Sequence, residues 1–184
     1  TLITAGAAQW HDYEILKLGI NKNQNVEVSD ITNNWTCLIV TGPNSRSLIN
    51  SISNADLTLP WLSLQNAKIE NKQILLARVS YAGELGWEIH AKNEDMSLIY
   101  EKVLSEGATP FGMFALDSLR VEKGYRTWKG DLSTDYSLLE SGLERFIKFD
   151  KKEVFPGKQS LLSEKQRGSV KKFVSMIIKD NVCD

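Results

Sequence analysis

The sequence predicts an α+β protein whose first lobe is a ferredoxin-like split βαβ arrangement. Short runs rich in β-branched and aromatic residues alternate with runs whose apolar residues recur at helical spacing. Between Trp35 and Glu106 the predicted order is strand, helix, strand, strand, helix. That order is typical of helices packed on one face of a mainly antiparallel sheet. A chain of 184 residues is long enough for one ordinary domain or two small lobes.

Two strands and a helix are predicted first. The segments Val26–Ile31 and Trp35–Thr41 indicate strands joined by a short asparagine turn. Gly42–Ser45 then predicts a turn that leads into a helix. The apolar residues at helical spacing in this helix are Leu48, Ile49 and Ile52. Residues 53–71 form a long irregular segment, which is typical of a functional loop.

A hairpin and the clearest helix of the chain follow. The segments Gln73–Ser80 and Gly86–Ala91 predict two paired strands, with Gly83 supplying turn chemistry between them. Asp95–Glu106 predicts a helix that ends at Gly107. The apolar residues on one stripe of this helix are Met96, Ile99, Tyr100, Val103 and Leu104.

The last third of the chain predicts two helices and two strands. Phe111–Lys123 should form a helix that ends at Gly124, and Gly157–Lys165 a second one. The expected apolar stripe of the first helix is Phe111, Phe114, Ala115, Ser118 and Leu119. Arg145–Phe149 and Lys172–Ile178 predict short strands. Because the chain starts on threonine and stops soon after the last predicted strand, we expect it to be truncated at both ends.

Composition excludes several classes of function. The chain has 22 basic and 23 acidic residues, a net charge of -1, which gives no general attraction to nucleic acid or anionic membranes. No apolar stretch approaches the roughly 20 residues that span a bilayer, and no signal peptide is visible. Cys37 and Cys183 cannot make a disulfide framework or a four-ligand zinc site, and Cys37 is most simply a small buried hydrophobe. We therefore expect a reducing compartment, the cytoplasm or, in a eukaryote, the mitochondrial matrix.

The second strand of the predicted hairpin carries the first candidate site. Strand alternation places Trp87 on one face, and Glu88 and His90 on the other. A carboxylate within an otherwise apolar hairpin either faces water or accepts hydrogen bonds from a ligand with two adjacent N–H donors, such as a pterin or a guanidine. Tyr81 at the hairpin tip would then stack on a flat ring, or it serves turn packing. The residues alone leave both alternatives open.

The helix after residue 111 carries the second candidate site. Asp117, Arg120 and Lys123 lie close to one helical face, where Asp117 and Arg120 make an ordinary ion pair by default. Arg126, beyond the helix, is either a clamp for a carboxylate or a solvated loop residue. The chain has none of the HExxH, CxxC, GxSxG or Gly-rich phosphate-loop patterns. We therefore assign no catalytic residue and no metal ligand.

Two blocks of residues resemble a known family. They are Ser80-Tyr81-x-Gly83-Glu84-x-Gly86-Trp87-Glu88 and Asp117-Ser118-Leu119-Arg120-x-Glu122-Lys123-Gly124-Tyr125-Arg126-x-Trp128. Both resemble the aminomethyltransferase family, which comprises the T-protein of the glycine cleavage system and the folate-binding half of sarcosine and dimethylglycine dehydrogenases. Further blocks match in the same order: Thr41-Gly42-Pro43-Asn44, Leu139-Glu140-x-Gly142-Leu143 and Phe155-x-Gly157-Lys158. The second main block is closer to the sarcosine dehydrogenase branch.

The resemblance implies a fold and a ligand. The family forms a three-lobed ring that binds tetrahydrofolate, on which an iminium-level one-carbon unit is captured to give 5,10-methylenetetrahydrofolate. Residues 1–110 would be part of the ferredoxin-like folate-binding lobe, and residues 111–184 a second lobe and the start of a missing C-terminal lobe. Glu88 resembles the carboxylate that holds the pterin, and Tyr81 the pocket tyrosine. Glu84 belongs to the motif and serves either the ligand or the turn.

The chain also departs from the family pattern. Leu116 stands where T-proteins have an arginine that helps hold folate. Either Arg120 or Arg126 replaces this contact, or the contact is missing in this chain. The catalytic aspartate of the family would lie upstream of Thr1. A flavin-binding lobe is absent as well, so FAD and any dehydrogenase chemistry would belong to the rest of the parent polypeptide or to a flavoprotein subunit.

Two other functions compete with a folate-binding enzyme module. The chain alone would be inactive, and it could be a non-catalytic scaffold that keeps the fold and packs against a flavoprotein subunit. The iron–sulfur-assembly folate protein shares the fold, but its K-G-C-Y-x-G-Q-E stretch is not found here.

Overall fold

The computed structural model describes residues 1–21 and 23–179, and the chain divides into two compact units. The first unit ends at Tyr125 and the second begins at Arg126. The expected division into lobes at residues 110 and 111 stays a prediction. Cys183, one of the two cysteines, lies outside the described residues.

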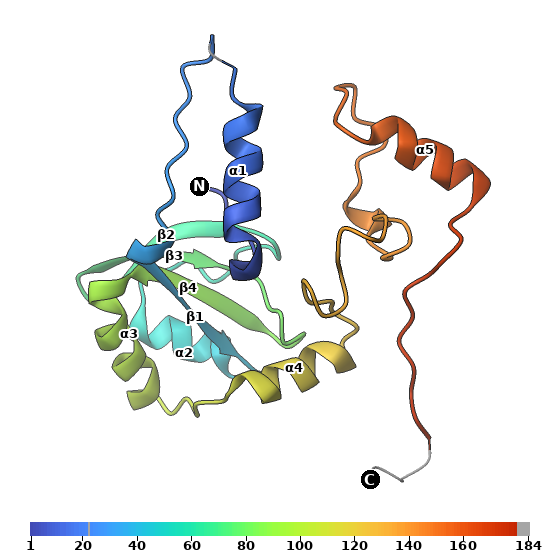
Figure 1. Ribbon diagram of the computed structural model, residues 1–184. Coiled ribbons are helices and arrows are strands. Elements are labelled where there is room, and N and C mark those ends of the chain that lie inside the picture. Colours follow the sequence, from blue (N-terminus) through green and yellow to red (C-terminus); the bar gives the residue numbers. More distant parts are fainter. Residues whose placement is uncertain (22, 180–184) are drawn as a thin grey trace. The chain divides into compact units, whose positions relative to one another are not determined.

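The first unit is built on an antiparallel sheet, drawn as arrows in Figure 1. Among the described residues it has four strands, in the spatial order β1-β4-β3-β2. These strands are β1 (Trp35–Thr41), β2 (Leu64–Ile69), β3 (Lys72–Ala77) and β4 (Gly86–Lys92). Each neighbouring pair is antiparallel. The combination of this sheet with helices confirms the α+β class. The strand predicted at Trp35–Thr41 is β1, and the predicted hairpin is β3–β4.

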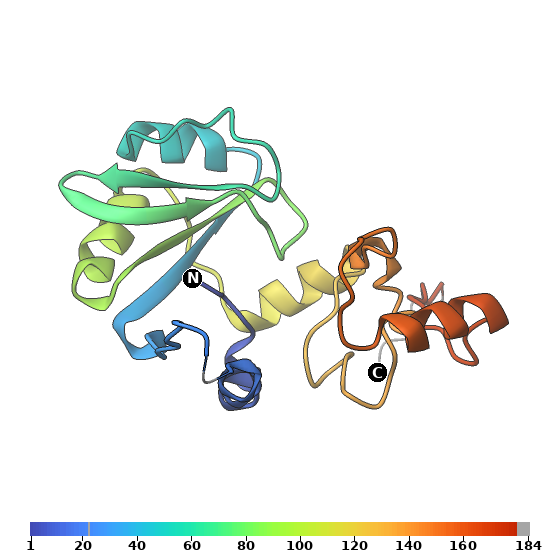
Figure 2. The ribbon, with the colours of Figure 1, turned by 90° about the horizontal axis from the view of Figure 1, so that it is seen from above.

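Helices α2 (Ser45–Ile52) and α3 (Asn93–Ser105) pack on one face of the sheet. Ile49 of α2 and Ile99 of α3 are both fully buried. They meet the sheet residues of the same core, which include Val40, Ile69, Ile74, Leu76, Trp87, Ile89 and Ala91. Figure 2 shows α2, in cyan, over one face of the sheet. Burial of this apolar surface, at roughly 25 cal/mol per Å², is the main stabilising contribution in the unit.

Two predictions for the first unit are wrong. Residues 26–31 form no strand and have no ladder partner; they lead instead into the short 3₁₀ segment η2 (Thr32–Asn34). The segment 53–71, expected to be irregular, contains β2, which pairs with β3 over its whole length. Upstream of both lie η1 (Gly6–Ala8) and α1 (Gln9–Gly19), and α1 has no buried residue.

Helix α4 (Met113–Glu122) exists where it was predicted, but its expected apolar stripe is wrong. Phe114 is 94% exposed, and Leu116 and Arg120 are the buried residues of this helix. Arg120 faces inward because its guanidinium makes two hydrogen bonds. It donates one of 2.6 Å to the Asp117 carboxylate and one of 3.0 Å to the carbonyl of Tyr125. Polar contacts therefore set the rotation of α4. Gly124, at φ +74°, ends the helix as expected.

The second unit holds η3 (Glu144–Phe146) and α5 (Lys158–Arg167). The predicted helix is α5, whereas the predicted strands at 145–149 and 172–178 are not formed. The N–H of Phe173 donates 2.8 Å to the carbonyl of Glu140, an isolated bond that does not extend into a ladder. Among the described residues, neither of these apolar runs pairs with a strand.

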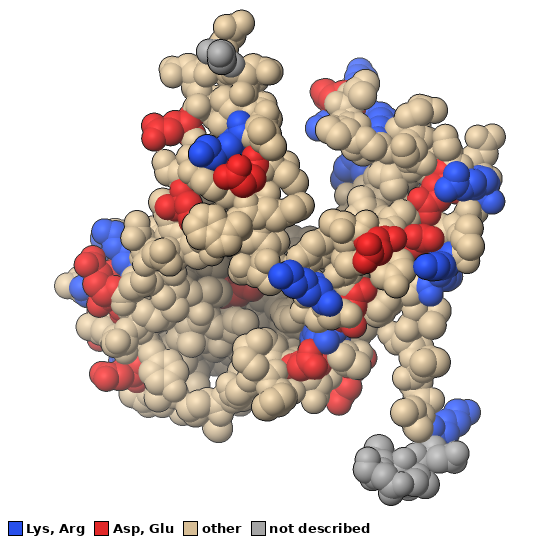
Figure 3. Space-filling model, viewed as in Figure 1, with Lys and Arg blue, Asp and Glu red and all other residues tan. Residues whose placement is uncertain are grey.

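No helix in the described part of the chain is long and apolar enough to cross a membrane. On the faces of both units that Figure 3 shows, basic and acidic side chains are interspersed. That mixture agrees with the near-zero net charge.

Candidate functional site

The face of the sheet opposite α2 and α3, here called the open face, carries the first candidate site. Along β4, Trp87 and Ile89 enter the core, so Glu88 and His90 project from the other face. The side chain of Glu88 is 24% exposed and that of His90 is 11% exposed. Glu88 lies directly between Ile39 of β1 and Ala77 of β3 in the strand register. The carboxylate is thus half-buried among apolar neighbours.

Glu88 belongs to a cluster of three polar side chains on the open face. Its Oε2 atom lies 3.1 Å from Nε2 of His90, and the same Nε2 lies 3.9 Å from Sγ of Cys37. Cys37 is the direct cross-strand partner of His90. Desolvation of the thiol, followed by the charge of Glu88, raises the pKa of Cys37 to about 12, although the residue as a whole is exposed. The thiol is therefore protonated at neutral pH as long as no cation lies beside it.

Sequence reasoning missed this cluster. Alternation along β4 placed Glu88 and His90 together, but Cys37 was interpreted as a buried hydrophobe. The missing signal was the β1–β4 register, which brings residues more than fifty positions apart opposite each other.

Tyr81 lies in the loop between β3 and β4 and contacts the end of α4. Its ring is stacked on that of Tyr125, with ring centroids 6.3 Å apart and an interplanar angle of 13°. The loop approaches α4 so closely that a Cβ on Gly83 would lie 2.4 Å from the Lys123 side chain. The buried Arg120 donates a hydrogen bond of 3.0 Å to the carbonyl of Tyr125. Tyr81 and Arg120, predicted separately, thus meet at Tyr125.

The other residues of the hairpin motif serve the fold. The carbonyl of Leu85 accepts three hydrogen bonds, from the N–H of Gly42 at 2.8 Å and from the hydroxyls of Thr41 and Ser45 at 3.2 and 3.0 Å. A Cβ on Gly86 would lie 2.8 Å from Cβ of Ser80. These contacts interlock the two matching blocks around residues 41–45 and 80–88. Glu84 is exposed in this loop.

Trp87 is buried between two arginines. The guanidinium groups of Arg46 and Arg78 lie 5.5 and 5.6 Å from its ring centroid. Each arginine also donates to a carbonyl of the segment before β2, Arg46 to Leu57 and Arg78 to Leu59. Trp87 and the two cations therefore fasten that segment onto the sheet.

Arg126 belongs to the second unit. Its guanidinium carbon lies 4.6 Å from the ring centroid of Phe173, and a Cβ on Gly142 would lie 2.8 Å from its Nη2 atom. Gly142 has φ +66°, which favours glycine. These contacts give Arg126 a packing role inside its own unit.

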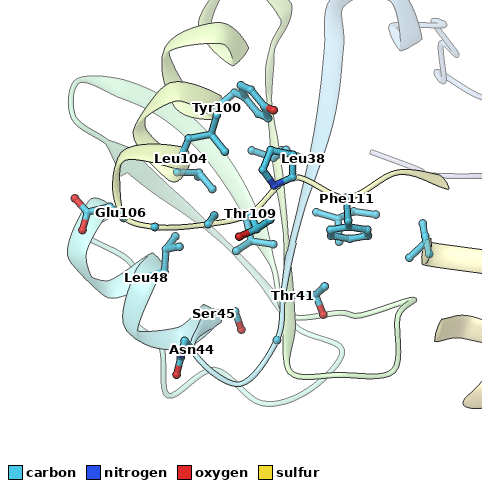
Figure 4. Close-up of a pocket in the computed structure, with 18 of the residues that line it drawn as sticks. Leu38, Thr41, Asn44, Ser45, Leu48, Tyr100, Leu104, Glu106, Thr109 and Phe111 are labelled. Atoms are coloured by element: carbon cyan, nitrogen blue, oxygen red, sulfur yellow. The ribbon is translucent and has the colours of Figure 1, made fainter. Parts of the chain in front are cut away.

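A cavity of about 800 Å³ lies along the outer edge of β1, as the close-up in Figure 4 shows. Leu38 and Thr41 of β1 line it, and Tyr100 and Leu104 of α3 form a second wall. Leu116 of α4, the residue that departs from the family pattern, also lines it. The walls mix apolar side chains with hydroxyls and amides, which suits a small organic ligand.

Comparisons with known proteins match almost the whole chain. Residues 1–151 match a family model described as the GCVT N-terminal domain. The chain is 34% identical to "Dimethylglycine dehydrogenase, mitochondrial" of Rattus norvegicus, over 96% of this chain and 22% of that protein. It is 32% identical to "Aminomethyltransferase" of Halothermothrix orenii, over 86% of this chain and 46% of that protein. "Sarcosine dehydrogenase, mitochondrial" of Mus musculus is 28% identical over 98% of this chain and 21% of its own length.

The chain is much shorter than these relatives. It spans about a fifth of the two dehydrogenases and just under half of the aminomethyltransferase.

Proposed function

The chain belongs to the GCVT N-terminal domain family, and we propose on this premise that it is a tetrahydrofolate-binding module for one-carbon transfer to folate. The relatives that it matches are enzymes, named as aminomethyltransferases and as dimethylglycine and sarcosine dehydrogenases. The dehydrogenase-like branch is the better proposal, because the block around Lys123 and Tyr125 is closest to it. FAD, the amine substrate and the remaining lobes would then belong to other parts of the parent protein or to a flavoprotein subunit.

The half-buried carboxylate of Glu88 carries this proposal. A carboxylate has about four acceptor positions on its two oxygens, so the contact with His90 leaves capacity for a ligand. The edge of a pterin ring presents an N–H and an amino group side by side, which one carboxylate accepts as a pair. Apolar neighbours on both flanking strands lower the local dielectric and strengthen such a pair.

Tyr81 supplies an aromatic surface next to the same hairpin. Its stacking on Tyr125 fixes the ring plane, and Arg120 holds the main chain of Tyr125 through a hydrogen bond to its carbonyl. A planar pterin stacks well on a ring that is already held in place. Arg120 therefore acts as a positioning residue in this proposal. Arg126 as a carboxylate clamp and Glu84 as a ligand contact stay predictions.

Tetrahydrofolate, when bound, supplies the nucleophilic nitrogens that take up the one-carbon unit. The residues of this chain bind and orient it: Glu88 fixes the ring edge and Tyr81 the ring plane. Oriented binding lowers the entropic part of the barrier for capture. No residue here is assigned a proton-transfer role. Because several relatives are named as mitochondrial, we propose the mitochondrial matrix as the location if the organism is a eukaryote.

Titration calorimetry with tetrahydrofolate tests the proposed pocket. Glu88→Gln keeps the shape of the side chain but replaces one acceptor oxygen by a donor, which would face a pterin donor. A hydrogen bond to a charged group contributes about 1.5–3 kcal/mol, so the affinity should fall by roughly 10- to 150-fold. Glu101→Gln, an exposed carboxylate on α3, is the matched control and should bind like the parent chain. Equal affinity of the Glu88 variant would remove this pocket from the proposal.

A scaffold role is the alternative, and Leu116 favours it. This residue is 6% exposed on α4 and leaves the cavity wall apolar where family members place an arginine. A scaffold would keep the fold, ignore folate and pack against a flavoprotein subunit. Size-exclusion chromatography of the chain co-expressed with such a subunit discriminates: co-elution without any heat of folate binding supports the scaffold.

A further inference from the structure

The open face of the sheet brings together three side chains of the types that bind transition metals. Cys37 comes from β1, and Glu88 and His90 come from β4. Each offers one donor atom, and these three atoms all lie within 4.8 Å of one another. Sulfur, imidazole nitrogen and carboxylate oxygen are the donors that Zn²⁺ takes in proteins.

The strand register explains why the donors converge. Glu88 and His90 are two positions apart on β4, so they share a face, and Cys37 stands directly opposite His90 on β1. Two strands paired over seven residues hold these positions without any loop. Sites built on strands keep their geometry better than sites built on loops.

Two of the three donor spacings are close to those of a tetrahedral site. The third, between Sγ of Cys37 and the Glu88 carboxylate, is no more than 4.8 Å. Zinc with Zn–S of about 2.3 Å and Zn–N of about 2.0–2.1 Å separates neighbouring ligand atoms by roughly 3.3–3.6 Å. Here Sγ of Cys37 and Nε2 of His90 are 3.9 Å apart, and Nε2 and Oε2 of Glu88 are 3.1 Å apart. Both separations differ from the tetrahedral range by a few tenths of an ångström. Rotation about the side-chain bonds is enough to close such a difference.

We propose that Cys37, Glu88 and His90 form a binding site for Zn²⁺ or a similar transition-metal ion. The ion would take Sγ, Oε2 and Nε2 as its three protein ligands and keep one position open to water or a ligand. On binding, the S–H bond of Cys37 breaks, its proton leaves to solvent, and the thiolate electron pair forms the bond to the metal. No electron is transferred in this step.

The chemistry of the donors favours zinc over magnesium or calcium. Those two cations take oxygen ligands almost exclusively, whereas thiolate and imidazole select zinc and its softer neighbours. A hydrogen-bonded pair of His90 and Glu88 is the competing use of the same atoms. That pair leaves the Cys37 thiol as a weak partner of a nitrogen 3.9 Å away, whereas an ion between the three uses all of them.

Cobalt spectroscopy tests the site, with Co²⁺ as the probe. The whole chain, freed of metal by a chelator, should bind one equivalent of Co²⁺ and show a thiolate-to-cobalt charge-transfer band in the near ultraviolet. Zn²⁺ should abolish the band by displacement. Cys37→Ser should remove the band, while His90→Gln and Glu88→Gln should weaken binding by more than the roughly 10–100-fold typical of outer-shell partners.

Matched controls come from the other cysteine and the other histidine. Cys183→Ser and His11→Gln should leave the spectrum unchanged, because His11 lies on exposed α1, where it pairs with Asp12. Circular dichroism of each variant checks that the fold is kept. A band that survives Cys37→Ser, or a natively folded parent chain that shows no band, would overturn the site. Both proposals place a ligand on the Glu88 carboxylate, so Glu88→Gln alone does not separate them. Cys37→Ser and His90→Gln spare that carboxylate, and the cobalt readout uses no folate, so these two variants distinguish a failure of the metal site from a failure of the proposed function.

Discussion

The two units of the chain are stabilised by different kinds of contact. In the first, a sheet and two helices enclose a core in which Leu76, Trp87 and Ile99 are fully buried. In the second, the carboxylate of Glu164 accepts hydrogen bonds from Ser137 at 2.7 Å and Ser169 at 2.6 Å. The stability gained from burying apolar side chains depends weakly on pH, whereas the stability gained from a hydrogen-bonded carboxylate depends on whether that group is charged. The units should therefore respond differently to cavity-forming substitutions and to acid.

The largest expected effect is a cavity in the first unit. Leu76→Ala removes buried methyl groups from the centre of the sheet and should cost about 2–5 kcal/mol of unfolding free energy. Hydrogen exchange followed by mass spectrometry reports the opening of each unit separately, and faster exchange should appear in residues of the sheet. Val170→Ala, at a position 89% exposed in the second unit, is the control. Equal effects of the two substitutions would contradict the assigned core.

Glu164 should give the second unit its pH dependence. Hydrogen bonds from the hydroxyls of Ser169 and Ser137 hold the pKa of this carboxyl below its ordinary value of 4.5. The contribution to stability is therefore complete above about pH 4.5 and is lost as the pH falls through the lower pKa of the folded state. Glu164→Gln should flatten this acid-induced opening, measured as hydrogen exchange of the second unit as the pH is lowered from about 6 to about 3. An unchanged profile would assign the acid sensitivity elsewhere.

The first unit could be predicted from the sequence better than the second, because its apolar patterns belong to strands that pair with each other. Trp35–Thr41 and the hairpin have strong apolar patterns that pair with each other, so local propensity and tertiary contacts agree. Lys172–Ile178 has a similar apolar pattern but finds no ladder partner among the described residues, and it forms no strand. Propensity alone cannot form a strand, because a strand is completed by its neighbour.

The candidate site also has a part that could be predicted from the sequence and a part that could not. Glu88 and Tyr81 follow from alternation and turn position, which are local properties of the hairpin. The cluster with Cys37 and the stacking of Tyr81 on Tyr125 depend on contacts between distant segments, which spacing does not reveal. The rotation of α4 was wrong for a related reason: the bonds of Arg120 outweigh a modest apolar stripe.

Two glycines sharpen the description of the first unit. A Cβ on Gly86 would lie 2.8 Å from the Cβ of Ser80, which is not the far end of a flexible side chain, so the backbone must shift and Gly86→Ala should cost about 1–3 kcal/mol. Gly107 has φ +89° and open space around it, so Gly107→Ala suffers only the backbone strain of about 1 kcal/mol. Urea denaturation followed by circular dichroism measures both. A larger effect at Gly107 would mean that the interlocked loops tolerate expansion.

The smallest expected effect is at Phe114 of α4, the helix whose orientation depends on the polar contacts of Arg120. Phe114→Ser replaces the most conspicuous apolar residue of the helix, yet at 94% exposure it should change the unfolding free energy by no more than about 0.5 kcal/mol. Leu116→Ala, only two positions away but 6% exposed, should cost about 2–4 kcal/mol. Thermal denaturation of the two variants compares them directly. If Phe114→Ser were the more damaging, the apolar stripe expected from spacing would be the buried face after all, and Arg120 would have to point outward, away from Tyr125.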